Sequence, residues 1–270
     1  MMSENRYKYV CLDLDGTLLD SKKRISAVNQ KAIVEIHQKG VSFIAATGRH
    51  LMETLALLKD FHLLSSFDYV VFADGCGIYD IRKDAVLETF SLTNNDIKVI
   101  LKVMNRRGNI MAFYNEKNDF FVFDRLSVKN IFYVLRNNVL HKSKNRYLYY
   151  PFLHLFSWNV EKQKAVLPKL PLSGKKELVN CGFYVLETNQ ATEVLPVNKC
   201  IALEKLFEKI GACGKEVLYI GDEFNDRECF ELFDSVVMGN APDRLKQYSL
   251  IRAKTNDEDG VGCALYEIFS

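Results

Sequence analysis

The first 80 residues alternate short apolar runs with segments of helical periodicity, and this alternation is the strongest constraint on the fold. Apolar runs at 7–14, 41–46 and 69–73 predict buried strands, and segments at 26–40 and 51–61 predict the helices between them. Ser26 suits the start of the first helix as an N-cap, and Gly40 suits its left-handed end. Because helices between successive strands produce βαβ units, we expect a mainly parallel sheet of the α/β class.

The same pattern returns near Ala191 and continues to the last residues. It predicts helices at 199–210, 225–232 and 260–269, a short helix after Asn240, and strands at 216–220, 235–238 and 250–252. The two ends of the chain therefore predict one doubly wound, Rossmann-like core.

Residues 85–190 have a different pattern. A helix is expected at 93–107, followed by the aromatic-rich strands NIMAFYN and DFFVFD, which are separated only by EKN. Consecutive antiparallel strands are typical of an α+β unit. We further expect helices at 127–137 and 160–167, strands at 152–158 and 178–187, and a surface loop at 167–177. The predicted organisation is a core of residues 1–84 and 191–270 with an α+β cap domain inserted at 85–190.

Composition excludes several classes of protein. The chain has 36 basic and 34 acidic residues, a net charge of +2, so no global field attracts nucleic acid or an anionic membrane. No apolar run approaches the roughly 18 residues of a membrane span, and the start lacks a signal-peptide core. The seven scattered cysteines form no C-x-x-C pair, which favours reduced thiols. We expect a cytoplasmic protein, either monomer or homodimer, with no nucleic-acid or membrane partner.

Acidic residues follow the first predicted strand directly. Asp13 and Asp15 stand one residue apart, and Gly16 permits a tight turn after them. The second strand ends in Thr47-Gly48-Arg49, and the strand at 216–220 leads into Gly221-Asp222-Glu223-Phe224-Asn225-Asp226. In open α/β sheets, ligands bind beyond the carboxyl ends of the strands where the strand order reverses. If these strands are neighbours, the acids, hydroxyl and glycines converge on a site suited to Mg²⁺ and a phosphate.

Six segments of the chain resemble one known family. They are DLDGT (13–17), ATGR (46–49), EVLPVNKCIAL (193–203), GDEFND (221–226), VVMGNAPDRLK (236–246) and NDEDGVGCAL (256–265). Their order and spacing resemble the haloacid dehalogenase superfamily of phosphohydrolases, and within it the Cof-like branch. The position of the insert, between the second motif and Lys199, is similar to the α/β cap of that branch.

The resemblance implies a role for each matched residue. Asp13 would be the nucleophile that forms an aspartyl-phosphate, and Asp15 would be the general acid and base. Mg²⁺ would be held by Asp13, by the main-chain carbonyl of Asp15 and by Asp222, with Asp226 supporting these ligands. The residues expected to bind the phosphate are Thr47, Gly48, Lys199 and Asn225.

The expected activity is Mg²⁺-dependent hydrolysis of phosphate monoesters of small metabolites, sugar phosphates first and phosphorylated cofactors second. A phosphotransferase or hexose phosphomutase of the same fold is one alternative, and a non-catalytic sensor of phosphorylated metabolites is another. Arg49 has two interpretations, a substrate contact or a structural ion pair. The chain departs from the family at Asp74, where Asn is common, and at Cys200, where Gly is common.

Overall fold

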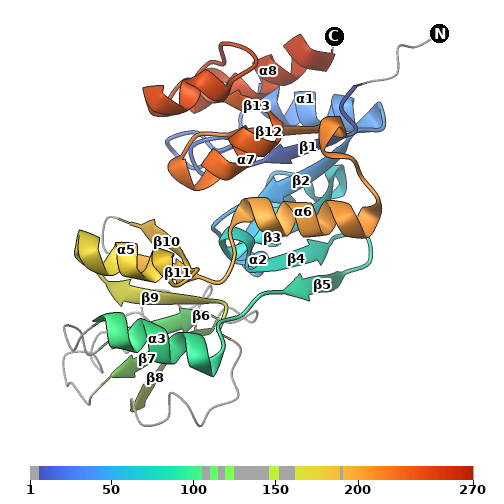
Figure 1. The fold of residues 1–270 in the computed structure, drawn as a ribbon. Helices are drawn as coiled ribbons and strands as arrows, with labels where there is room; N and C mark the ends of the chain where they lie inside the picture. The colour runs from blue at the N-terminus through green and yellow to red at the C-terminus, as the bar shows by residue number, and fades with distance from the viewer. Residues whose placement is uncertain are drawn as a thin grey trace. The chain divides into compact units, whose positions relative to one another are not determined.

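The computed structural model describes residues 6–104, 110–114, 119–124, 146–151, 162–188 and 191–269. The chain divides into two compact units (Figure 1). The first contains residues 1–49, 54–88 and 199–270, and the second contains residues 50–53 and 89–198. Both ends of the chain therefore build one unit, and the middle of the chain builds the other.

The first unit contains a seven-stranded sheet in the order β13-β12-β1-β2-β3-β4-β5. Its parallel part consists of β13 (Asp234–Val237), β12 (Val217–Gly221), β1 (Tyr9–Leu12), β2 (Ser42–Ala46) and β3 (Phe67–Phe72). Beyond β3 the sheet continues with β4 (Gly77–Asp80), which is antiparallel to β3, and ends in the edge strand β5 (Ala85–Thr89). The prediction of a mainly parallel α/β sheet is confirmed.

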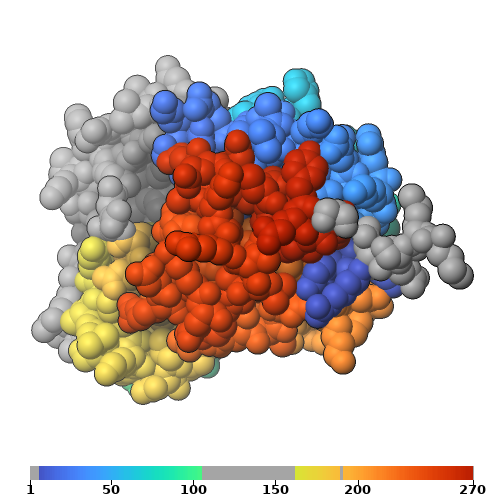
Figure 2. Space-filling model, turned by 90° about the horizontal axis from the view of Figure 1, so that it is seen from above, coloured from blue at the N-terminus to red at the C-terminus, as the bar shows by residue number. Residues whose placement is uncertain are grey.

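Helices cover this sheet. They are α1 (Ala27–Gln38), α2 (Leu51–Asp60), α6 (Lys199–Ile210), α7 (Arg227–Leu232) and α8 (Gly260–Phe269). As predicted, Ser26 caps α1 by accepting a hydrogen bond from the Asn29 amide at 3.1 Å, and Gly40 has a φ of +90° after its end. Helix α1 packs against α8, where Asn29 Oδ1 accepts a hydrogen bond from the Gly262 amide at 2.8 Å. The early and late parts of the chain meet over one continuous surface (Figure 2).

The second unit contains a mainly antiparallel six-stranded sheet in the order β10-β11-β9-β6-β7-β8. Its strands are β6 (Ile110–Tyr114), β7 (Asp119–Asp124), β8 (Arg146–Pro151), β9 (Lys164–Pro168), β10 (Tyr184–Glu187) and β11 (Ala191–Leu195). Helices α3 (Asn94–Met104) and α5 (Leu172–Asn180) share a buried cluster with this sheet that includes Ile97, Ile100, Ala165 and Leu178. The expected α+β character is confirmed, as is the antiparallel pairing of β6 with β7.

Four of the predicted elements are wrong in whole or in part. Residues 164–168 form strand β9 rather than a helix at 160–167, because a short apolar run carries no period that separates helix from strand. Helix α5 occupies part of the expected loop at 167–177 and the first part of the expected strand at 178–187. It follows Pro171 and buries Leu178. Residues 250–252 are not a strand, although Leu250 donates a backbone hydrogen bond to Ser235. The helix expected at 127–137 and the strand at 152–158 lie outside the described residues.

The two units differ from the predicted boundaries at 84/85 and 190/191. Residues 85–88 group with the first unit because β5 continues the edge of its sheet. Residues 191–198 group with the second unit because β11 pairs with both β9 and β10. Within the described part of the chain, no helix is long and apolar enough to cross a membrane.

Candidate active site

Strand β1 lies at the centre of the parallel sheet, between β12 and β2. The chain leaves β1 toward β2 through α1, whereas β12 joins from the other end of the sequence, so the strand order reverses here. Asp13 stands directly after β1, and its amide donates to the Ile220 carbonyl of β12 at 2.9 Å. The first acid of the sequence motif is therefore at the topological switch point, where α/β sheets bind ligands.

Lys199, the first residue of α6, reaches the same point. Its side chain is 1% exposed, and its Nζ lies 2.7 Å from Asp13 Oδ1 and 2.8 Å from Asp226 Oδ1. Burial alone would lower the pKa of Lys199, but the Asp13 and Asp226 charges outweigh this and raise that pKa well above its usual range. Lys199 is therefore a permanent buried cation shared by two carboxylates.

Asp226 is saturated with hydrogen bonds. Its Oδ1 accepts from Lys199 and from the Tyr219 hydroxyl at 2.7 Å, and its Oδ2 accepts from the backbone amides of Asp222 and Glu223, both at 3.2 Å. With both oxygens occupied in this way, Asp226 fixes the loop that carries Asp222 and the position of the Lys199 ammonium.

Asp222 faces the turn that follows β1. Its Oδ1 accepts a hydrogen bond from Thr17 Oγ1 at 2.9 Å, and its Oδ2 accepts one from Asn240 Nδ2 at 3.2 Å. Asn240 also donates to the Gly16 carbonyl at 2.9 Å. Gly16 has a φ of +87°, and a Cβ at this position would overlap the Asp222 carboxylate. The turn after β1 thus requires glycine for both its conformation and its close approach to Asp222.

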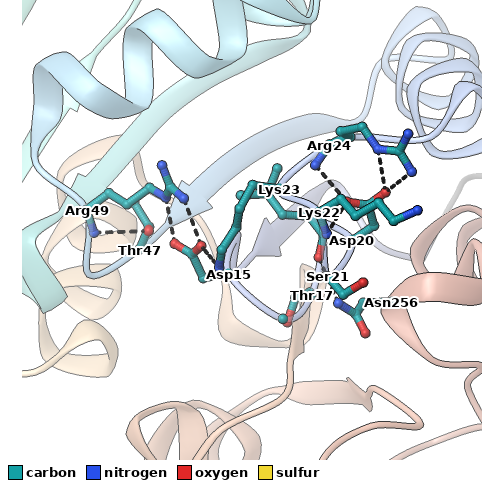
Figure 3. Close-up of polar contacts among 12 residues, drawn as sticks. Asp15, Thr17, Asp20, Ser21, Lys22, Lys23, Arg24, Thr47, Arg49 and Asn256 are labelled. Carbon is teal, nitrogen blue, oxygen red and sulfur yellow. Dashed lines mark hydrogen bonds and ion pairs between the residues drawn. The ribbon is translucent and has the colours of Figure 1, made fainter. Parts of the chain in front are cut away.

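Asp15 is paired with two cations (Figure 3). Arg49 donates two hydrogen bonds to it, from Nε to Oδ2 at 2.6 Å and from Nη2 to Oδ1 at 2.8 Å. Lys23 Nζ donates to Oδ1 at 2.7 Å from the other side. Partial burial by itself raises the pKa of Asp15, but the hydrogen bonds from Arg49 and Lys23 outweigh it and lower that pKa to about 2. Of the two interpretations of Arg49, the structure shows the ion pair.

The remaining predicted residues lie around the loop that follows β3. Thr47 Oγ1 accepts a hydrogen bond from the Arg49 amide at 3.2 Å, and the Thr47 carbonyl accepts one from the Asp74 amide at 3.0 Å. The Asp74 carboxylate is packed against Gly48 and lies 3.4 Å from Asn225 Nδ2. Thr47, Gly48 and Asn225 are thereby brought together around Asp74.

Three carboxylates of the site could hold a metal ion. Within the described residues, oxygen atoms of Asp13, Asp222 and Asp226 lie within 4.8 Å of one another, and all three residues are buried. Burial raises the pKa of Asp13 well above its usual range, since Lys199 opposes this only in part and Asp226 and Asp222 add to it. Burial also raises the pKa of Asp222 to about 7. A second cation beside Lys199 would lower the pKa values of Asp13 and Asp222 toward their usual range. A set of carboxylate oxygens suits a hard divalent ion.

Three contacts of the site were absent from the sequence-based prediction. Asn240 follows β13 at the same edge of the sheet, so its place after a predicted strand was a usable signal. Tyr219 lies on β12 and supports Asp226. Lys23 gave no signal, because its approach to Asp15 depends on a left-handed backbone (φ 60°) in an irregular loop.

Comparison with known proteins agrees with this geometry. The family sequence model of the haloacid dehalogenase-like hydrolases matches residues 10–265 of this chain. The chain belongs to this family. A Bacillus subtilis relative, the 5-amino-6-(5-phospho-D-ribitylamino)uracil phosphatase YcsE, is 30% identical over 96% of this chain and 94% of its own length. A second phosphatase of that description from the same organism, YwtE, is 26% identical over 97% of this chain and 98% of its own.

A solved structure supports the same assignment. The crystal structure of a haloacid dehalogenase-like hydrolase from Bacteroides thetaiotaomicron has a TM-score of 0.77 and 26% identity, covering 97% of this chain and 100% of that one. Full-length similarity to phosphatases, together with the family model, identifies the chain as an enzyme, a phosphatase of the haloacid dehalogenase-like hydrolases.

Proposed function

We propose that the protein hydrolyses phosphate monoesters of small metabolites in a Mg²⁺-dependent reaction that passes through an aspartyl-phosphate on Asp13. The observation that carries the proposal is the buried Asp13 carboxylate, held 2.7 Å from the buried Lys199 ammonium at the centre of the sheet. A carboxylate so fixed beside a cation is oriented for attack on phosphorus, and the cation offsets charge that develops on the phosphoryl oxygens.

The proposed reaction has two steps. An Asp13 oxygen forms a bond to phosphorus as the ester bond breaks, and Asp15 gives a proton to the leaving oxygen. Water then attacks the aspartyl-phosphate, with Asp15 taking its proton, which releases inorganic phosphate and restores Asp13. The Thr47 hydroxyl, the Gly48 amide, Asn225 and Lys199 are proposed to bind the phosphoryl oxygens in both steps.

Asp15 must change partners to carry a proton. Paired with Arg49 and Lys23, it is a carboxylate at neutral pH, because its pKa is about 2. We therefore propose that substrate binding draws Asp15 away from at least one of these cations, after which its pKa rises. Lys23 is the more exposed partner and makes a single contact, so it is the easier of the two to release.

The site fits a bound Mg²⁺ by the chemistry of its donors. Asp13, Asp222 and the main-chain carbonyl of Asp15 are the proposed ligands, and Asp226 supports them through its hydrogen bonds to the loop of Asp222. When bound, the ion would supply positive charge that draws the phosphate into a pocket of acids.

The names of the two B. subtilis relatives support a small phosphorylated metabolite as substrate, because both act on a phosphorylated ribitylamino-uracil by name. Sugar phosphates and phosphorylated cofactors remain the proposed classes. We propose that the inserted second unit serves as the cap that selects among them. We also propose a cytoplasmic location, where cysteines are kept as thiols; the cysteines of the chain are Cys11, Cys76, Cys181, Cys200, Cys213, Cys229 and Cys263.

The decisive test is hydrolysis of p-nitrophenyl phosphate by the purified protein with Mg²⁺ and with EDTA. We expect activity that requires Mg²⁺ and that falls by at least about a thousandfold in Asp13→Asn, because the amide cannot attack phosphorus. Asp80→Asn is the matched control, since Asp80 is also a buried acid but lies at the amino end of the sheet, opposite Tyr69. Activity that is unchanged in Asp13→Asn would refute the proposal.

Two alternatives have distinct signatures in the same assay. A phosphotransferase or hexose phosphomutase would pass the phosphate to an added sugar faster than to water. A sensor would bind a phosphorylated metabolite and release no phosphate even at high enzyme concentration. A screen of phosphorylated metabolites ranked by kcat/KM then identifies the substrate class.

A further inference from the structure

The loop after β3 holds a carboxylate in a strained backbone. Ala73, Asp74 and Gly75 have φ values of 51°, 56° and 105°, three consecutive residues in the left-handed region. Only the third is a glycine, and aspartate is among the few other residue types that tolerate this conformation. Asp74 is only 6% exposed. A buried acid kept in such a backbone indicates a constraint that the surrounding structure imposes.

The Asp74 carboxylate forms part of the wall of the proposed phosphate pocket. A Cβ on Gly48 would lie 2.8 Å from Asp74 Oδ1, so the carboxylate is packed directly against the Gly48 backbone. Asn225 Nδ2 lies 3.4 Å from the same oxygen, and Asn225 Oδ1 is buried with no hydrogen-bond partner among the described residues. The Asp74 charge also acts on Lys199. All four proposed phosphate-binding residues, Thr47 through its carbonyl included, therefore contact Asp74 or lie within the field of its charge.

Asp74 does not belong to the proposed metal site. Among the described residues, the carboxylates that could share a cation are those of Asp13, Asp222 and Asp226. Asp74 also turns the Asn225 amide group toward itself, so that the carbonyl oxygen of Asn225, which cannot donate to a phosphate, is left without a partner in the described part of the chain. The negative charge of Asp74 opposes the binding of an anion by Gly48 and Lys199.

We propose that Asp74 is a positioning residue that holds the affinity of the site for phosphate low, so that the phosphate product leaves readily after hydrolysis. This inference rests on the proposed function, because it takes Gly48, Lys199 and Asn225 as the phosphate-binding residues. A buried unit charge at the pocket wall acts through an effective dielectric constant near 20 and is only weakly screened by salt. Removing it should tighten phosphate binding by about tenfold.

The test is Asp74→Asn, measured with inorganic phosphate in the presence of Mg²⁺. Asparagine has the shape of aspartate and tolerates a positive φ, so the loop is retained while the charge is removed. We expect the inhibition constant of phosphate to fall by about tenfold and the thermal shift caused by phosphate to grow. If product release limits turnover, kcat and KM fall together. Asp74→Gly also removes the charge, and glycine adopts a positive φ without strain. The inhibition constant of phosphate should fall in this variant as well.

Asp68→Asn is the matched control. Asp68 is a comparably buried acid near the amino end of β3, where Ser42 and Arg82 contact it, and we expect its replacement to leave the phosphate constant unchanged. An unchanged or weaker affinity for phosphate in both Asp74 variants would overturn the proposal, including the case in which only the melting temperature falls. The thermal shift needs no turnover, so it tests Asp74 even if the hydrolysis assay on p-nitrophenyl phosphate fails.

Discussion

Replacing Lys199 by methionine tests the electrostatics at the centre of the first unit. The substitution keeps an unbranched, apolar side chain of similar length on α6 and removes the ammonium between Asp13 and Asp226. At N–O separations of 2.7 and 2.8 Å, each attraction is worth about 6 kcal/mol at an effective dielectric constant near 20. Desolvation of the three charges offsets much of this sum, so the measured loss for a broken buried pair is about 3–5 kcal/mol.

The loss of folding free energy in Lys199→Met should be larger at higher pH. Without the ammonium, the Asp13 carboxylate loses its buried counter-ion, and its pKa, which burial already raises well above the usual range, rises further. Between the unfolded and the folded pKa of Asp13, the folded variant binds more protons than the unfolded one, so its free energy of unfolding falls as pH rises. The deficit relative to wild type should therefore be larger at pH 8 than at pH 5.

The difference is measured by urea unfolding at both pH values. Circular dichroism and hydrogen exchange of the β1 and β12 amides monitor the unfolding. Lys205→Met is the control, because Lys205 is on the same helix but forms an exposed pair with Glu208 at 2.9 Å, and its urea midpoint should stay close to that of wild type. A Lys199→Met loss below about 1 kcal/mol, or a loss that is equal at the two pH values, would refute this account of the buried cation.

Two further substitutions test the turn and the metal site. Gly16→Ala should lower the free energy of unfolding by at least about 1–2 kcal/mol, the cost of a left-handed alanine, and a denaturation curve measures this loss. The substitution should also weaken Mg²⁺ binding, because the new methyl group displaces the Asp222 carboxylate. A Mg²⁺ titration that gives an unchanged affinity would contradict this geometry. Asp222→Asn should stabilise the metal-free protein at pH 8, since the Asp222 pKa of about 7 lies above its unfolded value and ionisation therefore destabilises the fold as pH rises. The advantage should vanish below about pH 4, where the carboxyl is protonated in both states, and Mg²⁺ should raise the melting temperature of wild type but not of this variant. A Mg²⁺ response in the variant equal to that of wild type would count against Asp222 as a ligand.

The core could be predicted because its elements are long and their periods are distinct. Helix α1 has a cap, a regular apolar face and a glycine after its end, so three independent signals agreed on its bounds. The acids after β1 were found for a related reason. Two carboxylates directly after a buried apolar strand destabilise the fold unless a cation or a ligand compensates them, so they indicate a site. The order of the strands then determines which side chains converge.

The second unit could not be predicted as well, because its short elements take their conformation from packing. Helix α5 begins with Leu172-Ser173-Gly174, residues with weak helix preference as a set, and it is held by burial of Leu178 in the cluster with α3. The partners of Asp15 were hidden for a similar reason. Lys23 reaches it only because the loop from 20 to 24 folds back on itself through hydrogen bonds to Asp20.

The position of β1 between strands from opposite ends of the sequence has a consequence for synthesis of the protein. Lys199 is 186 residues from Asp13, and Asp222 is 205 residues from Thr17, its hydrogen-bond donor. A ribosome that adds about 5–20 residues per second therefore takes roughly 10 to 40 s to deliver the ammonium after the first carboxylate has emerged. Through that interval the early strands carry an acidic edge with no counter-ion from α6 and an unpaired flank where β12 belongs. The nascent chain acquires its central cation and closes its sheet in one late step, so a chain that stalls before α6 holds the acids of the site without the means to bury them.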